Sequence, residues 1–383
     1  MNLFISDFNV SDRKFIRAFF TGFVGLILFF GAVNLLVDPY GFHFNKRYTG
    51  FNRHKPSFLN YTRIVKLYNA NHIQPEGIFL GNSRILYLAP EEAFSRYRPL
   101  RFYNFSLSSG TPNEMKDLLN YAIRNYNIRF VCYGVDFIAM INWSTPYANT
   151  FDTLLVRGEK SMDLEFLKMH TSAQSVYETG RCIYTNITDP EGIRVQYHYN
   201  EFGSRTNRWR ELNYERMGDK WVRDEIAKVM ETYKPIYNAY SVRIPEYKEK
   251  AYRDILQTCH DNGIEYVAYI NPLFEDQFRL LLSSRAYPVY IEYLRFLAEN
   301  GGFWYFGGIN EKTSDMGYFW DSQHPRKKLS FILTDIMLNQ DSKEYRDIFF
   351  GHFYHSGNIG TLVSGLDSLR TVVTEGQIIE VNN

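Results

Sequence analysis

The chain has 383 residues, a formal net charge of +1 and a hydrophobic content of 45%. This length and composition predict one large or two smaller globular domains with an ample core. The near-neutral charge argues against a general nucleic-acid surface, so we expect no nucleic-acid partner. The three cysteines, Cys132, Cys182 and Cys259, lie far apart, which argues against a disulfide framework or a cysteine-based zinc site. No pattern in the sequence calls for a metal or a cofactor.

An uncharged segment near the N-terminus, residues 18–37, predicts a membrane anchor. At ~1.5 Å per residue this segment forms a helix of roughly 30 Å, the thickness of a bilayer core. Basic residues precede it, so we expect residues 1–17 in the cytoplasm and the rest of the chain outside an inner or plasma membrane. A cleaved signal peptide is the alternative, although the apolar run is long for one and no clean cleavage motif follows it.

The segments after the anchor predict alternating strands and helices. Residues 38–75 are rich in aromatic and basic side chains, and we expect them to form a juxtamembrane connector. Three apolar runs then predict strands: Gly77–Gly81, Arg101–Leu107 and Ile128–Phe137. A capping box from Thr111 to Glu114 predicts the start of a helix between the second and third of these strands.

The alternation lapses over residues 141–245, which we interpret as a long insertion that forms either a cap or a docking region. It then resumes in five elements: helix 247–262, strand 264–270, a helical segment 274–300 broken near Pro288, strand 302–308, and a helix after residue 324. The tail, 339–383, carries a weak helical pattern near 359–372. The alternation predicts an α/β domain, residues 76–140 and 246–338, built on a parallel sheet with helices on both faces.

Three polar residues are predicted to meet at the carboxyl edge of this sheet, where ligands bind in such folds. Ser83 follows the first strand, and Asp321 and His324 follow the last. A serine hydroxyl becomes a nucleophile when a histidine takes its proton and a carboxylate orients that histidine. We therefore expect a Ser83–His324–Asp321 triad, with the backbone N–H groups of Ser83 and Gly110 as oxyanion donors. The structural alternatives are a surface histidine at His324 and a helix N-cap at Asp321.

The motifs around these residues resemble those of the SGNH, or GDSL-like, hydrolase superfamily. "GNSR" (Gly81–Arg84) is similar to its serine block, "NFSLSSG" (Asn104–Gly110) to its glycine block and "DSQH" (Asp321–His324) to its D-x-x-H block. The resemblance implies a three-layer, flavodoxin-like parallel sheet and a serine-based acyl-transfer chemistry. It covers the anchor and the sheet but does not extend to the insertion.

One block departs from the family pattern. Its usual form is G-x-N-D, whose asparagine helps to bind the oxyanion, whereas "GVDF" places Asp136 at that position. An ionised Asp136 would repel an oxyanion, so this carboxyl is either protonated or directed elsewhere, and Asn82 or Asn104 donates instead. Arg84 has two interpretations, the placement of a charged substrate group and the pairing of an acid.

The anchor together with the "GNSR", "YNFSLSSG" and "YFWDSQHP" stretches resembles one branch of the superfamily, the membrane-anchored extracytoplasmic acyltransferases. This branch includes the alginate O-acetyltransferase accessory proteins and the D-alanine transfer protein of teichoic acids. The resemblance implies a partner, a polytopic membrane-bound O-acyltransferase, and a glycan or polysaccharide acceptor. The expected function is a serine O-acyltransferase, with acetyl as the expected group. The alternatives are an esterase of acylated glycans and an inactive, anchored glycan-binding or scaffold protein.

The insertion contains a group of candidate substrate-binding residues. Arg205, Arg208 and Arg210 either contact an anionic glycan or form a solvated polar face, which is the commoner arrangement. Trp209 lies among them and either stacks on a sugar ring or packs in the core. The sequence alone does not choose between these interpretations.

Overall fold

The computed structural model describes residues 10–43, 47–193, 195, 198–206, 208–339 and 347–381. The chain forms two compact units. Unit 1 comprises Met1–Tyr61 and Ser161–Val195, and unit 2 comprises Thr62–Lys160 and Gln196–Asn383. The predicted insertion, 141–245, is therefore divided between the units, because its middle part clusters with the N-terminal segment.

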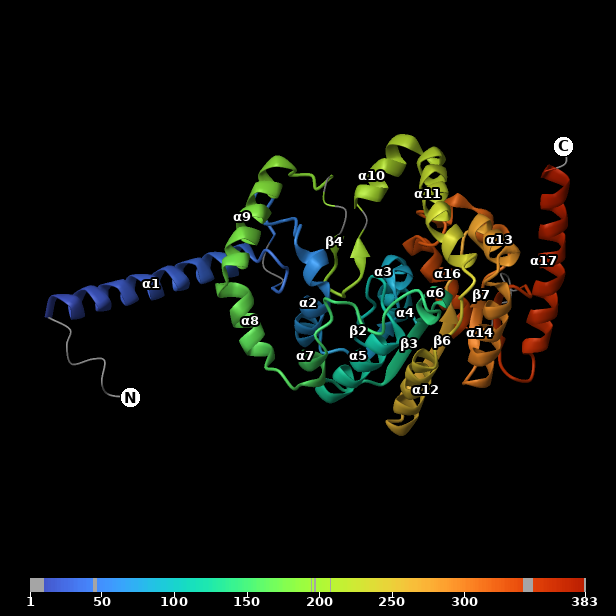
Figure 1. The fold of residues 1–383 in the computed structure, drawn as a ribbon, viewed down its shortest axis with the longest axis horizontal. Coiled ribbons are helices and arrows are strands. Elements are labelled where there is room, and N and C mark those ends of the chain that lie inside the picture. The colour runs from blue at the N-terminus through green and yellow to red at the C-terminus, as the bar shows by residue number, and fades with distance from the viewer. Residues whose placement is uncertain are drawn as a thin grey trace. The chain divides into compact units, whose positions relative to one another are not determined.

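Unit 1 contains the helices α1 (Val10–Val37), α8 (Met162–Thr171) and α9 (Ala173–Thr188). By length and composition, Asp12–Val37 of α1 could cross a membrane, and this stretch includes the predicted anchor. Figure 1 shows α8 and α9 running across the C-terminal end of α1. The predicted connector also contains a helix that its sequence pattern does not indicate, α2 (Phe58–Ile73).

Unit 2 is an α/β domain with a mostly parallel, mixed sheet. Its strands are β1 (Gly77–Leu80), β2 (Phe102–Asn104), β3 (Phe130–Val135), β6 (Glu265–Ile270), β7 (Phe303–Phe306) and β8 (Phe350–Tyr354). Their order is β2-β1-β3-β6-β7-β8. The neighbours from β2 to β7 pair in parallel, as predicted, whereas β8 pairs antiparallel with β7 and was not predicted.

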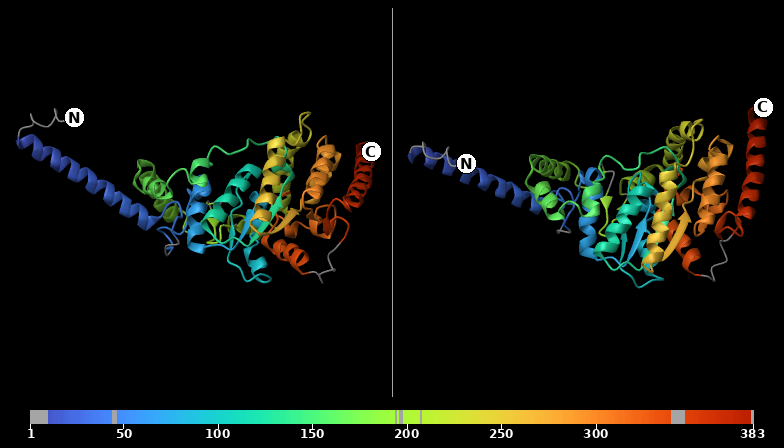
Figure 2. Two further views of the ribbon diagram at one scale, coloured as in Figure 1. Left: turned by 90° about the horizontal axis from the view of Figure 1, so that it is seen from below. Right: turned by 60° about the horizontal axis from the view of Figure 1, so that its bottom comes forward.

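Helices cover both faces of this sheet. Alternation along β3 directs Phe130 and Cys132 into the core that contains α16 (Lys327–Leu338). It directs Tyr133 to the opposite face, where its ring lies 6.0 Å from that of Tyr252 on α12 (Glu246–Asp261). In the right-hand view of Figure 2, α12 and its neighbour α5 (Pro112–Asn125) lie in front of the strands. The predicted capping box at the start of α5 is confirmed, with Pro112 in the first turn.

The remaining elements connect the sheet. Before residue 160 they are α3 (Ser83–Leu88), α4 (Glu91–Ser95), α6 (Phe137–Met140) and α7 (Thr153–Arg157). From 196 to 237 they are the hairpin β4 (His198–Tyr199) and β5 (Arg205–Thr206), then α10 (Arg208–Met217) and α11 (Asp219–Tyr237). Beyond β6 they are α13 (Glu275–Ser283), α14 (Tyr287–Glu299), α15 (Glu311–Ser314), a 3-10 turn (Met316–Tyr318) and α17 (Ile359–Val381). The break predicted near Pro288 separates α13 from α14.

Candidate active site

A sharp turn at the carboxyl end of β1 brings Ser83 to the start of α3. Gly81 adopts φ +148°, and a Cβ at this position would lie 2.9 Å from the carbonyl oxygen of Gly134, so only glycine fits without strain. Asn82 caps the helix, because its Oδ1 accepts a hydrogen bond from the N–H of Arg84 at 3.1 Å. The hydrophobic strand therefore ends with Ser83 as the first helical residue, half-buried.

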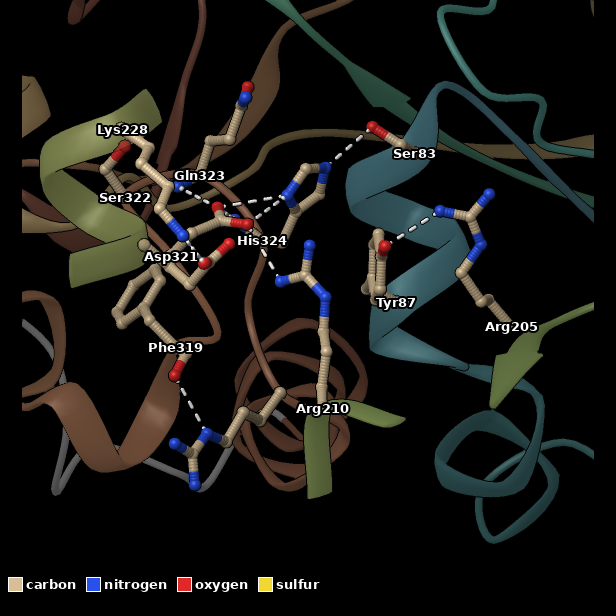
Figure 3. Close-up of polar contacts among 12 residues, drawn as sticks. Ser83, Tyr87, Arg205, Arg210, Lys228, Phe319, Asp321, Ser322, Gln323 and His324 are labelled. Carbon is tan, nitrogen blue, oxygen red and sulfur yellow. Dashed lines mark hydrogen bonds and ion pairs between the residues drawn. The ribbon is translucent and has the colours of Figure 1, made fainter. Parts of the chain in front are cut away.

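The three residues predicted as a triad lie in one hydrogen-bonded row (Figure 3). Ser83 Oγ is 2.9 Å from His324 Nε2, and His324 Nδ1 is 2.7 Å from Asp321 Oδ2. Asp321 Oδ1 also accepts from the N–H groups of Gln323 and His324. The N-cap alternative for Asp321 is wrong, because α16 begins only at Lys327. The carboxylate instead stabilises its own loop and orients the imidazole.

Arg210 reaches this row from the insertion. Its Nη1 lies 2.8 Å from Asp321 Oδ2, and its guanidinium carbon lies 4.7 Å from the centre of the Tyr87 ring. The Tyr87 ring in turn packs against His324, with 4.5 Å between ring centres. Figure 3 shows the Arg210 side chain extending between Tyr87 and the Asp321 carboxylate. Arg210 is thus neither a solvated surface residue nor free for a glycan through this nitrogen.

Burial, together with the charges of Arg210 and Arg84, favours the neutral form of His324. Burial lowers the pKa of His324 most strongly, Asp321 opposes that effect, and Arg210 and Arg84 lower the pKa further, with a net decrease. Burial raises the pKa of Asp321, but His324 and Arg210 outweigh it and hold the pKa well below its usual range. At neutral pH, His324 is therefore ready to accept a proton from Ser83.

Asp136, at the end of β3, is directed at Arg84 and Asn82. Its Oδ1 lies 2.6 Å from Arg84 Nη1, and its Oδ2 accepts from Asn82 Nδ2. Both Arg84 and Asp136 are buried. Burial lowers the pKa of Arg84, but Asp136 and nearby tyrosines outweigh it, and the pKa is raised. Of the two interpretations of Arg84, the pairing with an acid is the one observed.

Not all of the predicted oxyanion donors are available. The N–H of Gly110 donates to the carbonyl of Leu107 at 3.0 Å in a turn. The Asn104 side chain is fully buried, and its Nδ2 donates to Ser204 Oγ and to the carbonyl of Ile85. The N–H of Ser83 remains, since a first helical residue has no intrahelical acceptor.

Three basic side chains contact the 104–110 loop beside Ser83. The buried Lys66 amino group donates to the carbonyls of Asn104 and Ser106, at 2.7 and 2.5 Å. Arg63 Nη2 donates to the carbonyl of Ser108 at 3.1 Å, and Arg205 Nη2 donates to Ser108 Oγ at 2.9 Å. Burial holds the pKa of Lys66 well below its usual range. The positions of Lys66 and Arg63 on α2 could not be connected with this loop from sequence spacing.

The other insertion residues separate by position. Arg205 is buried against Tyr87 and Tyr199, whereas Arg208 is half-exposed and pairs with Glu211 and Glu215. Beside Arg210, a cavity of about 540 Å³ opens between α10 and α11. Its lining residues are Trp209, Arg210, Met217, Trp221, Asp224, Glu225 and Lys228. Arg210 therefore contacts the Asp321 carboxylate and also lines a cavity that aromatic and charged side chains surround.

Within the described ranges, no group of three or more His, Cys, Asp or Glu side chains is arranged to hold a metal ion. Comparison of the chain with protein-family models gives no match. Comparison with curated proteins gives no significant relative either. The site must therefore be interpreted from its own geometry and motifs.

Proposed function

We propose that the protein is a membrane-anchored serine O-acyltransferase that acts outside the cytoplasm on a hydroxyl of a cell-surface or extracellular glycan. The observation that carries this proposal is the row from Ser83 Oγ to His324 Nε2 (2.9 Å) and from His324 Nδ1 to Asp321 Oδ2 (2.7 Å). The strand order β2-β1-β3-β6-β7 supports the SGNH-like part of the proposal, since it is the order of flavodoxin-like sheets. The apolar helix α1 supports the anchor.

In the first step, Ser83 Oγ attacks the carbonyl carbon of an acyl donor while its proton passes to His324 Nε2. The carbonyl oxygen becomes an oxyanion that the N–H of Ser83 stabilises. The imidazolium is stabilised by Asp321 and returns the proton to the leaving group as the carbon–oxygen bond breaks. The product is an acyl ester on Ser83.

In the second step, an acceptor hydroxyl gives its proton to His324 and attacks the acyl ester. His324 then returns the proton to Ser83 Oγ as the bond between the acyl carbon and Oγ breaks, which restores both residues. Water in place of the glycan would make the same site an esterase, so the two activities differ in which acceptor reaches the acyl-enzyme. The cavity beside Arg210 supports a glycan acceptor, because Trp209 and polar side chains line it. The acyl donor is proposed to come from a polytopic membrane-bound O-acyltransferase, as in the family branch that the motifs resemble.

The test uses the purified full chain in nanodiscs, with an aryl acetate as donor. We expect acetyl to be found on Ser83 by mass spectrometry, and a fluorophosphonate to label the same residue. Ser83→Ala should abolish both, whereas Ser368→Ala on α17 should change neither. Adding oligosaccharide acceptors should divert acetyl from water to sugar. Hydrolysis that is unchanged by every acceptor would favour the esterase, and absence of labelling in a folded protein would favour the inactive scaffold.

A further inference from the structure

Helix α9 of unit 1 buries its polar face and exposes apolar side chains. Its buried residues are mostly polar: Ser175, Glu178, Thr179, Cys182 and Asn186. Its exposed large hydrophobic side chains are Tyr177, Tyr184 and Ile187, each 64–69% exposed. These three are seven and three positions apart, so they share one face, here called the apolar stripe. Arg181, whose side chain is 42% exposed, lies on the same face. A helix that meets water has the opposite arrangement, with its apolar face inward.

Hydrogen bonds hold α9 in this orientation. Asn34 of α1 donates to Ser175 Oγ at 2.9 Å and accepts from Thr179 Oγ1 at 2.5 Å. Asn186 accepts from the N–H of His54 and donates to its carbonyl, both at 2.8 Å. Rotating the apolar stripe inward would break these bonds and leave buried polar groups without partners. The hydrogen bonds of the opposite face therefore keep the apolar stripe exposed.

Helix α8 also exposes large apolar side chains. It exposes Leu164 and Leu167, which lie three positions apart on one face. Its last turn is tied to the same asparagine, because Asn34 Nδ2 donates to the carbonyl of His170 at 2.6 Å. One side chain of α1 thus fixes the junction of α8 and α9.

The place of this junction along α1 sets its depth in a membrane. Asn34 is three residues before Val37, the last residue of α1, so it lies about 5 Å from the helix end. Lys55 Nζ donates to the carbonyl of Val37 at 2.8 Å and lies 3.6 Å from Asp38. These two charged residues lie where the apolar part of α1 ends. An interfacial layer is roughly 5–7 Å thick on each side of a bilayer core. If α1 spans the bilayer, helices that cross it at Asn34 lie within that layer.

We propose that α8 and α9 lie in the plane of the membrane, at the interface where α1 ends, with the apolar stripe and Leu164 and Leu167 in contact with lipid. In-plane helices immerse their apolar face about 5–10 Å into the boundary between headgroups and acyl chains. Tyr177 and Tyr184 suit this depth, since tyrosine is enriched at membrane interfaces. The inference depends on α1 spanning the bilayer and does not depend on the proposed chemistry at Ser83.

The test places an environment-sensitive NBD dye on single introduced cysteines of the full chain in nanodiscs of phosphatidylethanolamine and phosphatidylglycerol. The variants are Tyr177→Cys, Tyr184→Cys, Ile187→Cys and Leu167→Cys. Lys250→Cys, on a charged exposed face of α12, is the matched control. The native cysteines Cys132, Cys182 and Cys259 are buried, so the unsubstituted protein reports background labelling.

We expect the four dyes on α8 and α9 to be protected from aqueous dithionite. Nitroxide lipids should quench them about twofold or more relative to the dye at position 250. Dyes that react with dithionite as fast as the control would overturn the proposal. So would dyes that stay in water in nanodiscs but become protected in native membranes, because the surface would then bind a protein. None of these readouts requires an active Ser83.

Discussion

The two units of the chain bury opposite kinds of side chain. In unit 2, α14 buries an apolar and aromatic set, Tyr287, Tyr290, Tyr293, Leu294, Phe296, Leu297 and Ala298. In unit 1, α9 buries a set that is mostly polar, Ser175, Glu178, Thr179, Cys182 and Asn186. The first arrangement is that of a domain in water, whose core is held by apolar burial. The second buries hydrogen-bonded polar side chains and leaves apolar surface outside, which fits a unit whose surroundings include lipid.

Both units contain a buried ion pair, which in unit 1 is Lys55 with Asp38, but they differ in the polar groups that join their elements. Unit 2 contains charged groups at one edge of its sheet, where Arg84 pairs with Asp136 and Arg210 with Asp321. Unit 1 links α1 to α9 through Asn34, Ser175 and Thr179, which carry no charge. Buried charges at a sheet edge are typical of sites that perform chemistry. Uncharged buried groups that all find hydrogen-bond partners are typical of structural packing.

The largest expected effect tests whether the chemistry belongs to unit 2. His324→Ala removes the proposed base for Ser83, so the proposed acyl transfer should fall about 10⁴–10⁶-fold. His260→Ala, at an exposed histidine on α12, should leave the rate unchanged. The rate is measured with an aryl acetate on the full chain in nanodiscs. A loss of less than tenfold in His324→Ala would show that the hydrogen-bonded row is structural.

The next effect concerns the charged network of unit 2. Arg84→Met leaves Asp136 buried without its cation, so the free energy of unfolding of unit 2 should fall by about 3–5 kcal/mol. All five tryptophans lie in unit 2, at positions 143, 209, 221, 304 and 320, so tryptophan fluorescence in urea reports on that unit. Arg253→Met, at a half-exposed arginine on α12, should change it by less than about 0.5 kcal/mol.

A double variant sharpens this measurement. Arg84→Met with Asp136→Leu removes both charges, and it should recover part of the lost stability, because a matched apolar pair no longer strands a buried carboxylate. If Arg84→Met alone costs less than about 1 kcal/mol, the pair is more hydrated than its burial indicates, and the contrast between the units is weaker.

The sequence predicted those parts of unit 2 whose pattern follows from burial. The strands around Phe79, Cys132 and Ala268 form apolar runs because helices cover both faces of the sheet. The proximity of Ser83, Asp321 and His324 could be predicted from the sequence, because parallel strands place their carboxyl ends at one edge of the sheet. Their hydrogen bonds lie within ordinary distances, while their catalytic roles stay a prediction.

Other features could not be predicted from local pattern. The polar face of α9 is buried and its apolar face is exposed, so the rule that apolar spacing marks a core fails for that helix. Arg210 was recognised as a candidate, but its contact with Asp321 depends on how α10 packs, which spacing does not reveal. Strand β8 was missed because it is a short antiparallel edge that begins beside Gly351, at φ +82°.

A smaller effect tests the neutral network of unit 1. Asn34→Leu removes the hydrogen bonds to His170, Ser175 and Thr179, and should cost about 1–3 kcal/mol of local stability. Cys182 is buried in unit 1, so its alkylation rate, mapped by mass spectrometry, reports the opening of that unit. We expect this rate to rise about 5–150-fold, while the rates at Cys132 and Cys259 in unit 2 stay constant.

The control for this experiment is Phe29→Leu, which changes an exposed side chain of α1 without removing a hydrogen bond. It should leave all three alkylation rates unchanged. Equal acceleration at Cys182 and Cys259 in Asn34→Leu would mean that the two units open together, which would contradict their treatment as separate networks.

The smallest effect concerns Arg210, the residue through which the insertion acts on the site. Its charge disfavours the imidazolium of His324, so Arg210→Gln should raise the pKa of His324. His324 must be neutral to accept the proton of Ser83, so the acid limb of the pH–rate profile should move to higher pH. Activity should then fall at pH values below that limb and change little above it.

Two neighbouring variants separate charge from structure. Arg208→Gln, two positions away and paired only with surface glutamates in the described chain, should leave the acid limb in place. Arg210→Lys keeps the positive charge, so its acid limb should lie closer to that of the unsubstituted protein than the limb of Arg210→Gln does. A uniform loss of rate at every pH in Arg210→Gln would assign Arg210 to packing against Tyr87. A limb that moves to lower pH would contradict the electrostatic role, because removing a positive charge near His324 raises its pKa.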